Sequence, residues 1–110
     1  MHNAYRSGTA DVWYSGSAGD MWVEYKYVPL VPARAPIRVR TLLSARQLQW
    51  LKHRHAEGRT VAVILGVSHY AWIYEGMTWE SDDVTAVQIL KRGLDRKAVA
   101  DYIRRKTMKP

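Results

Sequence analysis

The chain has 110 residues, of which 47% are hydrophobic, and it carries a formal net charge of +7. This length suits one domain, so we expect residues 1–110 to form a single unit with its own core. The absence of cysteine excludes a disulfide framework and a thiolate metal site, and it suits an intracellular protein. We find no secretory pattern and no apolar run near the ~20 residues of a membrane span, so we expect a cytoplasmic protein.

The charges are arranged in blocks. Residues 29–59 carry seven basic side chains and one acidic side chain, and residues 91–110 carry eight basic and two acidic side chains. Residues 60–90 lie between these blocks and contain four acids and no Lys or Arg. Two basic blocks around an acidic middle favour a polyanionic partner, most simply nucleic acid. The alternative is a soluble domain whose helices have basic faces.

The first part of the chain predicts a hairpin followed by a loop. Residues 9–14 (TADVWY) and 21–28 (MWVEYKYV) are rich in β-branched and aromatic side chains, which is typical of strands. Gly and Ser dominate residues 15–19, which predicts a turn. We therefore expect the two strands to pair in antiparallel orientation. Residues 29–36 contain three prolines and predict a loop, and residues 37–40 (IRVR) predict a short edge strand.

The rest of the chain predicts three helices and two strands. The first helix is expected over 44–57, and the apolar run over 60–66 suits a central strand buried on both faces. Residues 70–75 are expected to pair with that strand, and helices are expected over 82–92 and 96–106. The predicted order is β-β-loop-α-β-β-α-α, a mixed α/β domain around one sheet.

Three charged residues of the predicted hairpin are expected to converge. Side chains alternate along a strand, so Glu24 and Lys26 project from the same face. A turn at residues 15–19 brings Asp11 beside Glu24 or within a residue or two of it. The hairpin therefore places two carboxylates and one lysine at one end.

This group suits a divalent cation next to a phosphodiester. Mg²⁺ prefers oxygen ligands and takes one or two carboxylates from a protein, and the carbonyl of Tyr25 is a natural further ligand. A metal lowers the pKa of a bound water, and Lys26 can orient that water. The alternative is an exposed Glu24–Lys26 ion pair, which contributes only about 0–1 kcal/mol.

The same residues resemble a known family. The stretch GTADVWYSGSAGDMWVEYK is similar to the signature of the PD-(D/E)XK nuclease superfamily, in which an Asp precedes a turn and a Glu-x-Lys strand. Ala10 stands where that family often has proline, and Asp11 is kept. The stretch LLSARQLQWLKHRHAEGRTVAVILG resembles the small virus-type (VRR-NUC-like) and phage-encoded members. The resemblance covers residues 8–75 and implies a restriction-endonuclease-like mixed sheet flanked by helices.

The resemblance also implies roles for individual residues. Asp11 and Glu24 would bind Mg²⁺ or Mn²⁺, Lys26 would position the water, and Gln47 would line the site from its helix. Read on its own residues, Ser44 with Gln47 is an S-x-x-Q capping box at the helix start. The capping role and the site role of Gln47 are compatible, and we weigh them equally.

The function implied is metal-dependent hydrolysis of DNA, including branched DNA such as a Holliday junction, in a phage-infected or prophage-bearing bacterium. Symmetric cleavage by a domain of this size needs a homodimer. Our expected phosphate contacts are the basic side chains between the site and its helix: Arg34, Arg38, Arg40, Arg46 and Lys52.

Two other functions stay open. The fold could serve as a non-catalytic nucleic-acid-binding module, or as a phage accessory protein that binds a host protein through an aromatic surface. Trp79 and Tyr70 fall outside the periodic apolar stripes and are candidates for a dimer surface. We expect the other tryptophans and tyrosines to be core or interface residues, in preference to base-stacking platforms.

One departure from the family concerns the start of the domain. The superfamily core normally begins with a helix that often supplies another acidic residue, and no acid precedes Asp11 in this sequence. Either the site lacks that group, or the C-terminal helices or a second subunit occupy the place of the helix.

Overall fold

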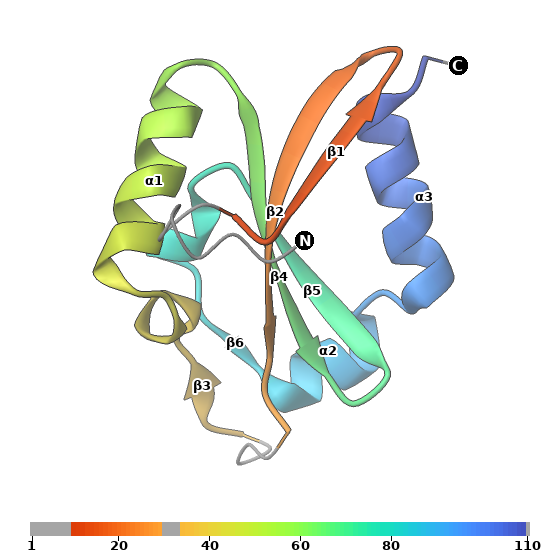
Figure 1. Cartoon of the computed structure of the whole chain (residues 1–110). Helices are drawn as coiled ribbons and strands as arrows, with labels where there is room; N and C mark the ends of the chain where they lie inside the picture. The colour runs from red at the N-terminus through yellow and green to blue at the C-terminus, as the bar shows by residue number, and fades with distance from the viewer. Residues whose placement is uncertain (1–9, 30–33, 110) are drawn as a thin grey trace.

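The computed structural model describes residues 10–29 and 34–109. Its main sheet has four strands in the order β1-β2-β4-β5 (Figure 1). These strands are β1 (Val12–Gly16), β2 (Gly19–Tyr27), β4 (Thr60–Val67) and β5 (Tyr70–Glu75). Strands β2 and β4 run parallel, whereas β1 and β5 are antiparallel to their neighbours, so the sheet is mixed.

Three helices surround this sheet. They are α1 (Ala45–Ala56), α2 (Ala86–Arg92) and α3 (Arg96–Thr107). Helix α1 lies between β2 and β4 in the chain and covers one face of the sheet, and α3 covers the other face (Figure 1). The domain is therefore α/β with a mixed four-stranded sheet, as the sequence predicts. None of the helices in 10–29 and 34–109 is long and apolar enough to cross a membrane.

Short elements fill one end of the domain. Strands β3 (Pro36–Ile37) and β6 (Val84–Thr85) pair antiparallel as a separate small sheet. Two 3₁₀ turns, η1 (Val39–Leu42) and η2 (Thr78–Glu80), stand before α1 and after β5. These turns contribute Val39 and Trp79 to the core.

The sequences of β4 and β2 explain why the sheet is covered on both faces: β4 is continuously apolar, and the side chains of β2 alternate between the two faces. The β4 run from Val61 to Leu65 is buried throughout, because β4 lies between β2 and β5 and is covered on both faces. On β2, Met21 and Val23 are fully buried on the α3 side, and Trp22 packs into the cluster on the α1 side. The predicted division of β2 into two faces is confirmed.

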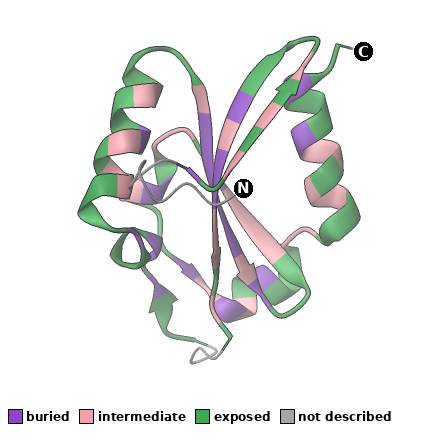
Figure 2. Ribbon diagram, viewed as in Figure 1, coloured by how far each residue is buried: buried purple, intermediate pink, exposed green. Residues whose placement is uncertain are grey.

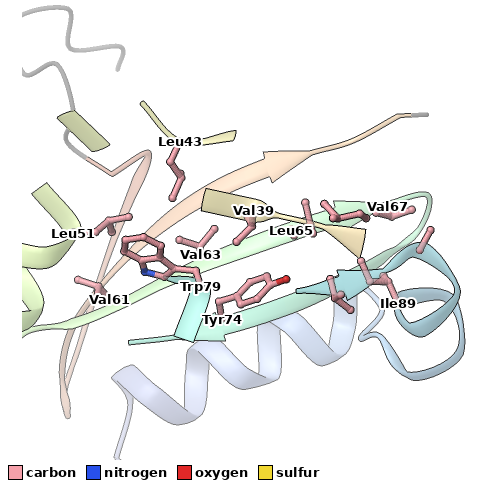
Figure 3. Packing of buried hydrophobic residues seen from close by; sticks show 13 residues of the cluster. Val39, Leu43, Leu51, Val61, Val63, Leu65, Val67, Tyr74, Trp79 and Ile89 are labelled. Carbon is pink, nitrogen blue, oxygen red and sulfur yellow. The ribbon is translucent and has the colours of Figure 1, made fainter. Parts of the chain in front are cut away.

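The core consists of two clusters separated by the sheet. The larger cluster lies on the α1 side and joins β4, α1, α2 and the 3₁₀ turns; it extends from Leu51 at one end, past Trp79 and Tyr74, to Ile89 at the other (Figure 3). The smaller cluster lies under α3 and includes Ile103. Buried positions accordingly concentrate along β4 and the inner sides of the helices (Figure 2).

The tip of the β1–β2 hairpin docks on the end of α3. The N–H of Ala18 donates to the carbonyl of Thr107 at 2.8 Å. Gly16 has no side chain, and a Cβ there would lie 2.2 Å from the same carbonyl oxygen. Glycine is therefore required at this position by the close approach of two backbones. This contact holds the tip of the hairpin against the last helix.

Several predicted bounds need correction. The strand expected over 37–40 is the two-residue β3, which begins at Pro36, and a 3₁₀ turn follows it. Proline is tolerated there because it is the first residue of a short strand. The predicted hairpin is present, but its turn is shorter than residues 15–19, because β1 continues to Gly16 and β2 begins at Gly19 instead of residue 21. Strand β2 ends at Tyr27, and β1 begins at Val12, later than the expected start at Thr9. Thr9 and part of the predicted proline-rich loop, residues 30–33, lie outside the described residues.

The start predicted for the second helix is also wrong. The sequence predicts a helix over 82–92, whereas α2 begins at Ala86 and is capped by Thr85. Thr85 and Gln88 form a T-x-x-Q capping box, the same pattern that starts α1. The two preceding aspartates lie in the loop before β6.

The proposal of Trp79 as a dimer-surface residue is wrong as well. Its side chain is only 2% exposed, because η2 turns it into the larger core cluster. Tyr70, the other candidate, is 39% exposed at the start of β5. The helix expected over 96–106 is confirmed to within one residue, with Asp95 as its cap.

Candidate active site

Asp11 and Glu24 meet immediately before the start of β1. The hairpin register pairs Val12 with Val23, so the next residue pair is Asp11 and Glu24. The backbone N–H of Asp11 donates to Glu24 Oε1 at 3.2 Å, and the backbone N–H of Tyr25 donates to Asp11 Oδ2 at 3.1 Å. The side chain of Asp11 thus extends the pairing of the two strands by one position before β1 begins. The predicted convergence of the two carboxylates is present.

Glu24 is buried and surrounded by donors. Its side chain is 2% exposed, and Oε2 lies 3.0 Å from Gln47 Nε2 and 3.4 Å from Lys26 Nζ. Burial, together with the negative charge of Asp11, raises the pKa of Glu24 to about 7, although Lys26 opposes this shift. A carboxylate of this pKa is only partly ionised at neutral pH. An additional positive charge nearby would ionise it fully.

Gln47 connects the helix start to this carboxylate. Its side-chain Oε1 accepts from the backbone N–H of Ser44 at 2.9 Å, and the backbone N–H of Gln47 donates to Ser44 Oγ at 3.1 Å. The remaining end of the amide, Nε2, donates to Glu24. One side chain therefore completes the capping box and orients Glu24, and the two roles are indeed compatible.

Lys26 is more accessible than Glu24, with which it is paired. Its side chain is 24% exposed, and its ammonium approaches Glu24 from the next position on the same face of β2. The side chains of Lys26 and Glu24 form an ion pair, one of whose members is buried. The arrangement therefore differs from the fully exposed pair considered as the alternative.

The oxygen atoms of this site fit a small divalent cation. Asp11 and Glu24 supply two carboxylates, and the N–H and C=O of a strand residue point toward the same edge, so the Tyr25 carbonyl faces Asp11. Mg²⁺ usually binds one or two carboxylates and completes its shell with water and phosphate. Among the described residues, no group of three or more His, Cys, Asp or Glu side chains could hold a metal. The donor set therefore fits an ion that shares its coordination with substrate, and it does not fit an all-protein cage.

The predicted phosphate contacts are exposed, and three of them have partners in the acidic middle of the chain. Arg38 Nε lies 3.5 Å from Asp83 Oδ2, and Lys52 Nζ lies 2.9 Å from Glu80 Oε1. Arg40 donates to the backbone carbonyl of Glu80 at 2.8 Å. Arg46 stands in the first turn of α1, next to Gln47, and Arg34 lies in the turn before β3. Arg46 is the predicted basic residue that is closest in sequence to the site.

A row of tryptophans lies beside the site and was not expected. Trp13 of β1 stacks on Trp22 of β2 with ring centroids 5.7 Å apart, and Trp22 meets Trp50 of α1 edge-to-face at 5.2 Å. The guanidinium of Arg54 stands 5.4 Å from the Trp50 ring. The hairpin register pairs Trp13 with Trp22 and could have predicted this stack.

The opposite face of the sheet has a different surface. An open groove of about 1060 Å³ runs between the sheet and α3, lined in part by Tyr14, Tyr25 and Val99. The hydroxyls of Tyr14 and Tyr25 lie 2.5 Å apart, and burial together with this contact raises the pKa of Tyr25. This side has tyrosines and apolar residues where the α1 side has carboxylates and tryptophans.

The chain was compared with known proteins. No protein-family model matches it, and neither the curated proteins nor the solved structures contain a match. The fold and the site geometry therefore have to carry the functional argument.

Proposed function

We propose that the chain is a metal-dependent endonuclease that hydrolyses DNA phosphodiester bonds on a restriction-endonuclease-like core. The observation that supports this most is the convergence of Asp11, Glu24, Lys26 and Gln47 at one point of the hairpin. A buried glutamate whose pKa is raised, next to a second carboxylate and a lysine, is typical of a site built for chemistry.

In this proposal Asp11, Glu24 and the Tyr25 carbonyl hold Mg²⁺ or Mn²⁺. When bound, the ion would lower the pKa of a water and place positive charge beside the phosphate. Lys26 orients the attacking water and faces the negative charge that builds on the phosphate oxygens. Gln47 keeps Glu24 turned toward the site through its 3.0 Å hydrogen bond. The basic residues around α1 position the DNA backbone.

Among the described residues, no third Asp or Glu joins Asp11 and Glu24 in a group that could hold a metal. Two carboxylates favour a single ion. Branched DNA is the substrate class that the resemblance suggests, and paired cuts would be made by a homodimer.

A non-catalytic nucleic-acid-binding module is the second candidate. It is favoured by the closed hydrogen bonding of Glu24, whose two oxygens already have three donors around them. In that case the cluster stabilises the join between hairpin and helix and binds no metal.

Cleavage assays separate the two functions. Duplex, flapped and four-way DNA should be incubated with the purified protein in Mg²⁺, Mn²⁺ or EDTA. We expect metal-dependent cutting, and we expect Lys26→Ala to lower the rate about 100-fold or more. Lys106→Ala is the matched control, because that lysine pairs with Glu75 away from the site. Absence of metal-dependent cutting on every substrate, or full activity of Lys26→Ala, would contradict the proposal.

A further inference from the structure

The tryptophan row has one buried end and one open end. Trp22 and Trp50 are partly buried against the larger core cluster. Trp13, at the outer end, is 53% exposed on the edge strand β1. An exposed Trp ring that is already stacked on one side presents a flat aromatic face to solvent. This face is available for another planar group.

The row lies on the same side of the hairpin as the proposed active site. The Trp13–Trp22 pair and the Asp11–Glu24 pair are two residues apart on both strands. Two residues of a strand span about 7 Å. A nucleic-acid strand whose phosphate lies at Asp11 and Glu24 would therefore have a neighbouring base within reach of Trp13.

The exposed face fits an unpaired base better than a paired one. Bases inside a duplex are covered on both faces by their neighbours, which are stacked about 3.4 Å apart along the strand. Only a terminal, splayed or single-stranded base has a free face for an aromatic side chain. Every base has such a face, so stacking is largely independent of sequence.

The charges around the row do not oppose a nucleic acid. Arg54 and Arg59 share the single carboxylate of Glu57, at 2.7 and 3.5 Å. Asp20 stands at the start of β2, opposite Ser15 and beyond Trp22 as seen from the site. The segment 29–59 that supplies Trp50 and these arginines carries seven basic and one acidic side chain. The α1 end of the row therefore has two arginines beside it and one glutamate.

We propose that Trp13, supported by Trp22 and Trp50, stacks on an unpaired nucleobase next to the scissile phosphate. The substrate would then carry a single-stranded segment at the cut, as in a flap, a gap or a frayed end. This inference rests on the proposed endonuclease function and adds a substrate class to it.

The test is a binding comparison in EDTA, where no metal-dependent cutting can interfere. Fluorescence anisotropy should be measured with labelled single-stranded, flapped and fully paired DNA. We expect Trp13→Ala to weaken binding of the first two by between about fivefold and 150-fold. The fully paired duplex should change by about twofold or less. Trp13→Phe keeps an aromatic face and should retain most of the affinity.

Tyr27→Ala is the matched control. Tyr27 is an exposed aromatic residue on β2, 63% exposed, and it lies outside the row. The Tyr27→Ala variant should bind all three DNAs as the wild type does. Thermal unfolding followed by circular dichroism checks that each variant folds.

The outcomes distinguish this inference from the proposed function. If the wild type cuts DNA and Trp13→Ala binds and cuts every substrate normally, the stacking inference is overturned and the endonuclease proposal stands. If no DNA is cut but Trp13→Ala loses single-strand affinity selectively, the stacking platform stands and the endonuclease proposal falls. An equal loss on paired and unpaired DNA overturns the preference for an unpaired base.

Discussion

The two faces of the central sheet are built from the same strands and differ in chemistry. Toward α1, β2 presents Trp22, Glu24 and Lys26, and toward α3 it presents Met21 and Val23. The α1 face has the larger apolar cluster and also holds the carboxylate of Glu24, whose side chain is 2% exposed. The α3 face has the smaller cluster, an open groove and no buried charge among the described residues.

This difference shows where the fold tolerates an unfavourable group. Burying a carboxylate is costly unless it is paired and hydrogen-bonded, so it needs rigid neighbours that hold its partners in place. The better-packed face supplies those neighbours through α1 and the hairpin base. A carboxylate at the open α3 groove would simply stay solvated.

The first prediction compares the packing of the two faces. Leu51 on α1 is 1% exposed within the larger cluster, and Ile103 on α3 is 9% exposed within the smaller one. Truncation of a buried Leu or Ile to Ala costs about 2–5 kcal/mol, depending on the cavity left behind. We expect Leu51→Ala near the upper end of this range and Ile103→Ala near the lower end, measured by urea unfolding.

The control for this comparison is Leu90→Ala, at a position that is 48% exposed on α2. Its effect should stay within about 0.5 kcal/mol, as is usual for surface sites. An equal or larger loss for Ile103→Ala would show that α3 is as tightly packed as α1. The contrast between the faces would then have to rest on charge alone.

The second prediction concerns pH and the buried carboxylate. The pKa of Glu24 is raised from 4.5 to about 7, so between these values the folded state binds a proton that the unfolded state has lost. Stability should therefore fall as the pH rises from about 4.5 through 7, and the loss attributable to Glu24 is about 3 kcal/mol. Glu24→Gln cannot ionise and should lack this part of the pH dependence.

The measurement is urea unfolding of the wild type and Glu24→Gln between pH 4.5 and 8, without divalent metal. The substitution alters the hydrogen bonding with Gln47 and Lys26. The informative quantity is therefore how the difference in unfolding free energy between the two proteins changes with pH. Parallel curves for the two proteins would show that Glu24 titrates normally. If the site binds Mg²⁺, adding it at pH 8 should stabilise the wild type and leave Glu24→Gln unchanged.

The strands of the main sheet and helices α1 and α3 could be predicted from the sequence because each is marked by a strong local pattern of residues. The apolar run of β4 and the capping residues Ser44 and Asp95 mark elements whose positions agree with the structure. The turn residues predicted a hairpin with Asp11 beside Glu24 or within a residue or two of it, and the observed register places the two residues opposite each other. Alternation along β2 then assigned Glu24 and Lys26 to one face.

The remaining features depend on contacts between distant segments. Strands β3 and β6 are two residues long and pair across nearly half of the chain, so no local pattern marks them. The burial of Trp79 depends on a three-residue 3₁₀ turn, which is too short to show periodicity. The raised pKa of Glu24 depends on burial and on Asp11, both of which require the folded hairpin and helix. The start of α2 is different, because its T-x-x-Q pattern was visible in the sequence.

The two capping boxes give the last and smallest prediction. Gln88 of α2 caps its helix through Thr85, with Oε1 2.8 Å from the Thr85 N–H. Gln47 does the same for α1 and also donates to Glu24 on the site face. Each Gln→Ala variant should lose about 1 kcal/mol from the cap. Gln47→Ala should lose about 1 kcal/mol more, because Glu24 also loses a hydrogen-bond donor.

The extra loss in Gln47→Ala should depend on pH, since the donor stabilises the ionised carboxylate most. It should be small at pH 5, where Glu24 is protonated, and reach its full size at pH 8. Urea unfolding of both variants at these two pH values gives the difference directly. Equal losses for Gln47→Ala and Gln88→Ala at both pH values would reduce Gln47 to a helix cap. Glu24 would then be held by Asp11 and Lys26, and the link from α1 to the proposed site would be lost.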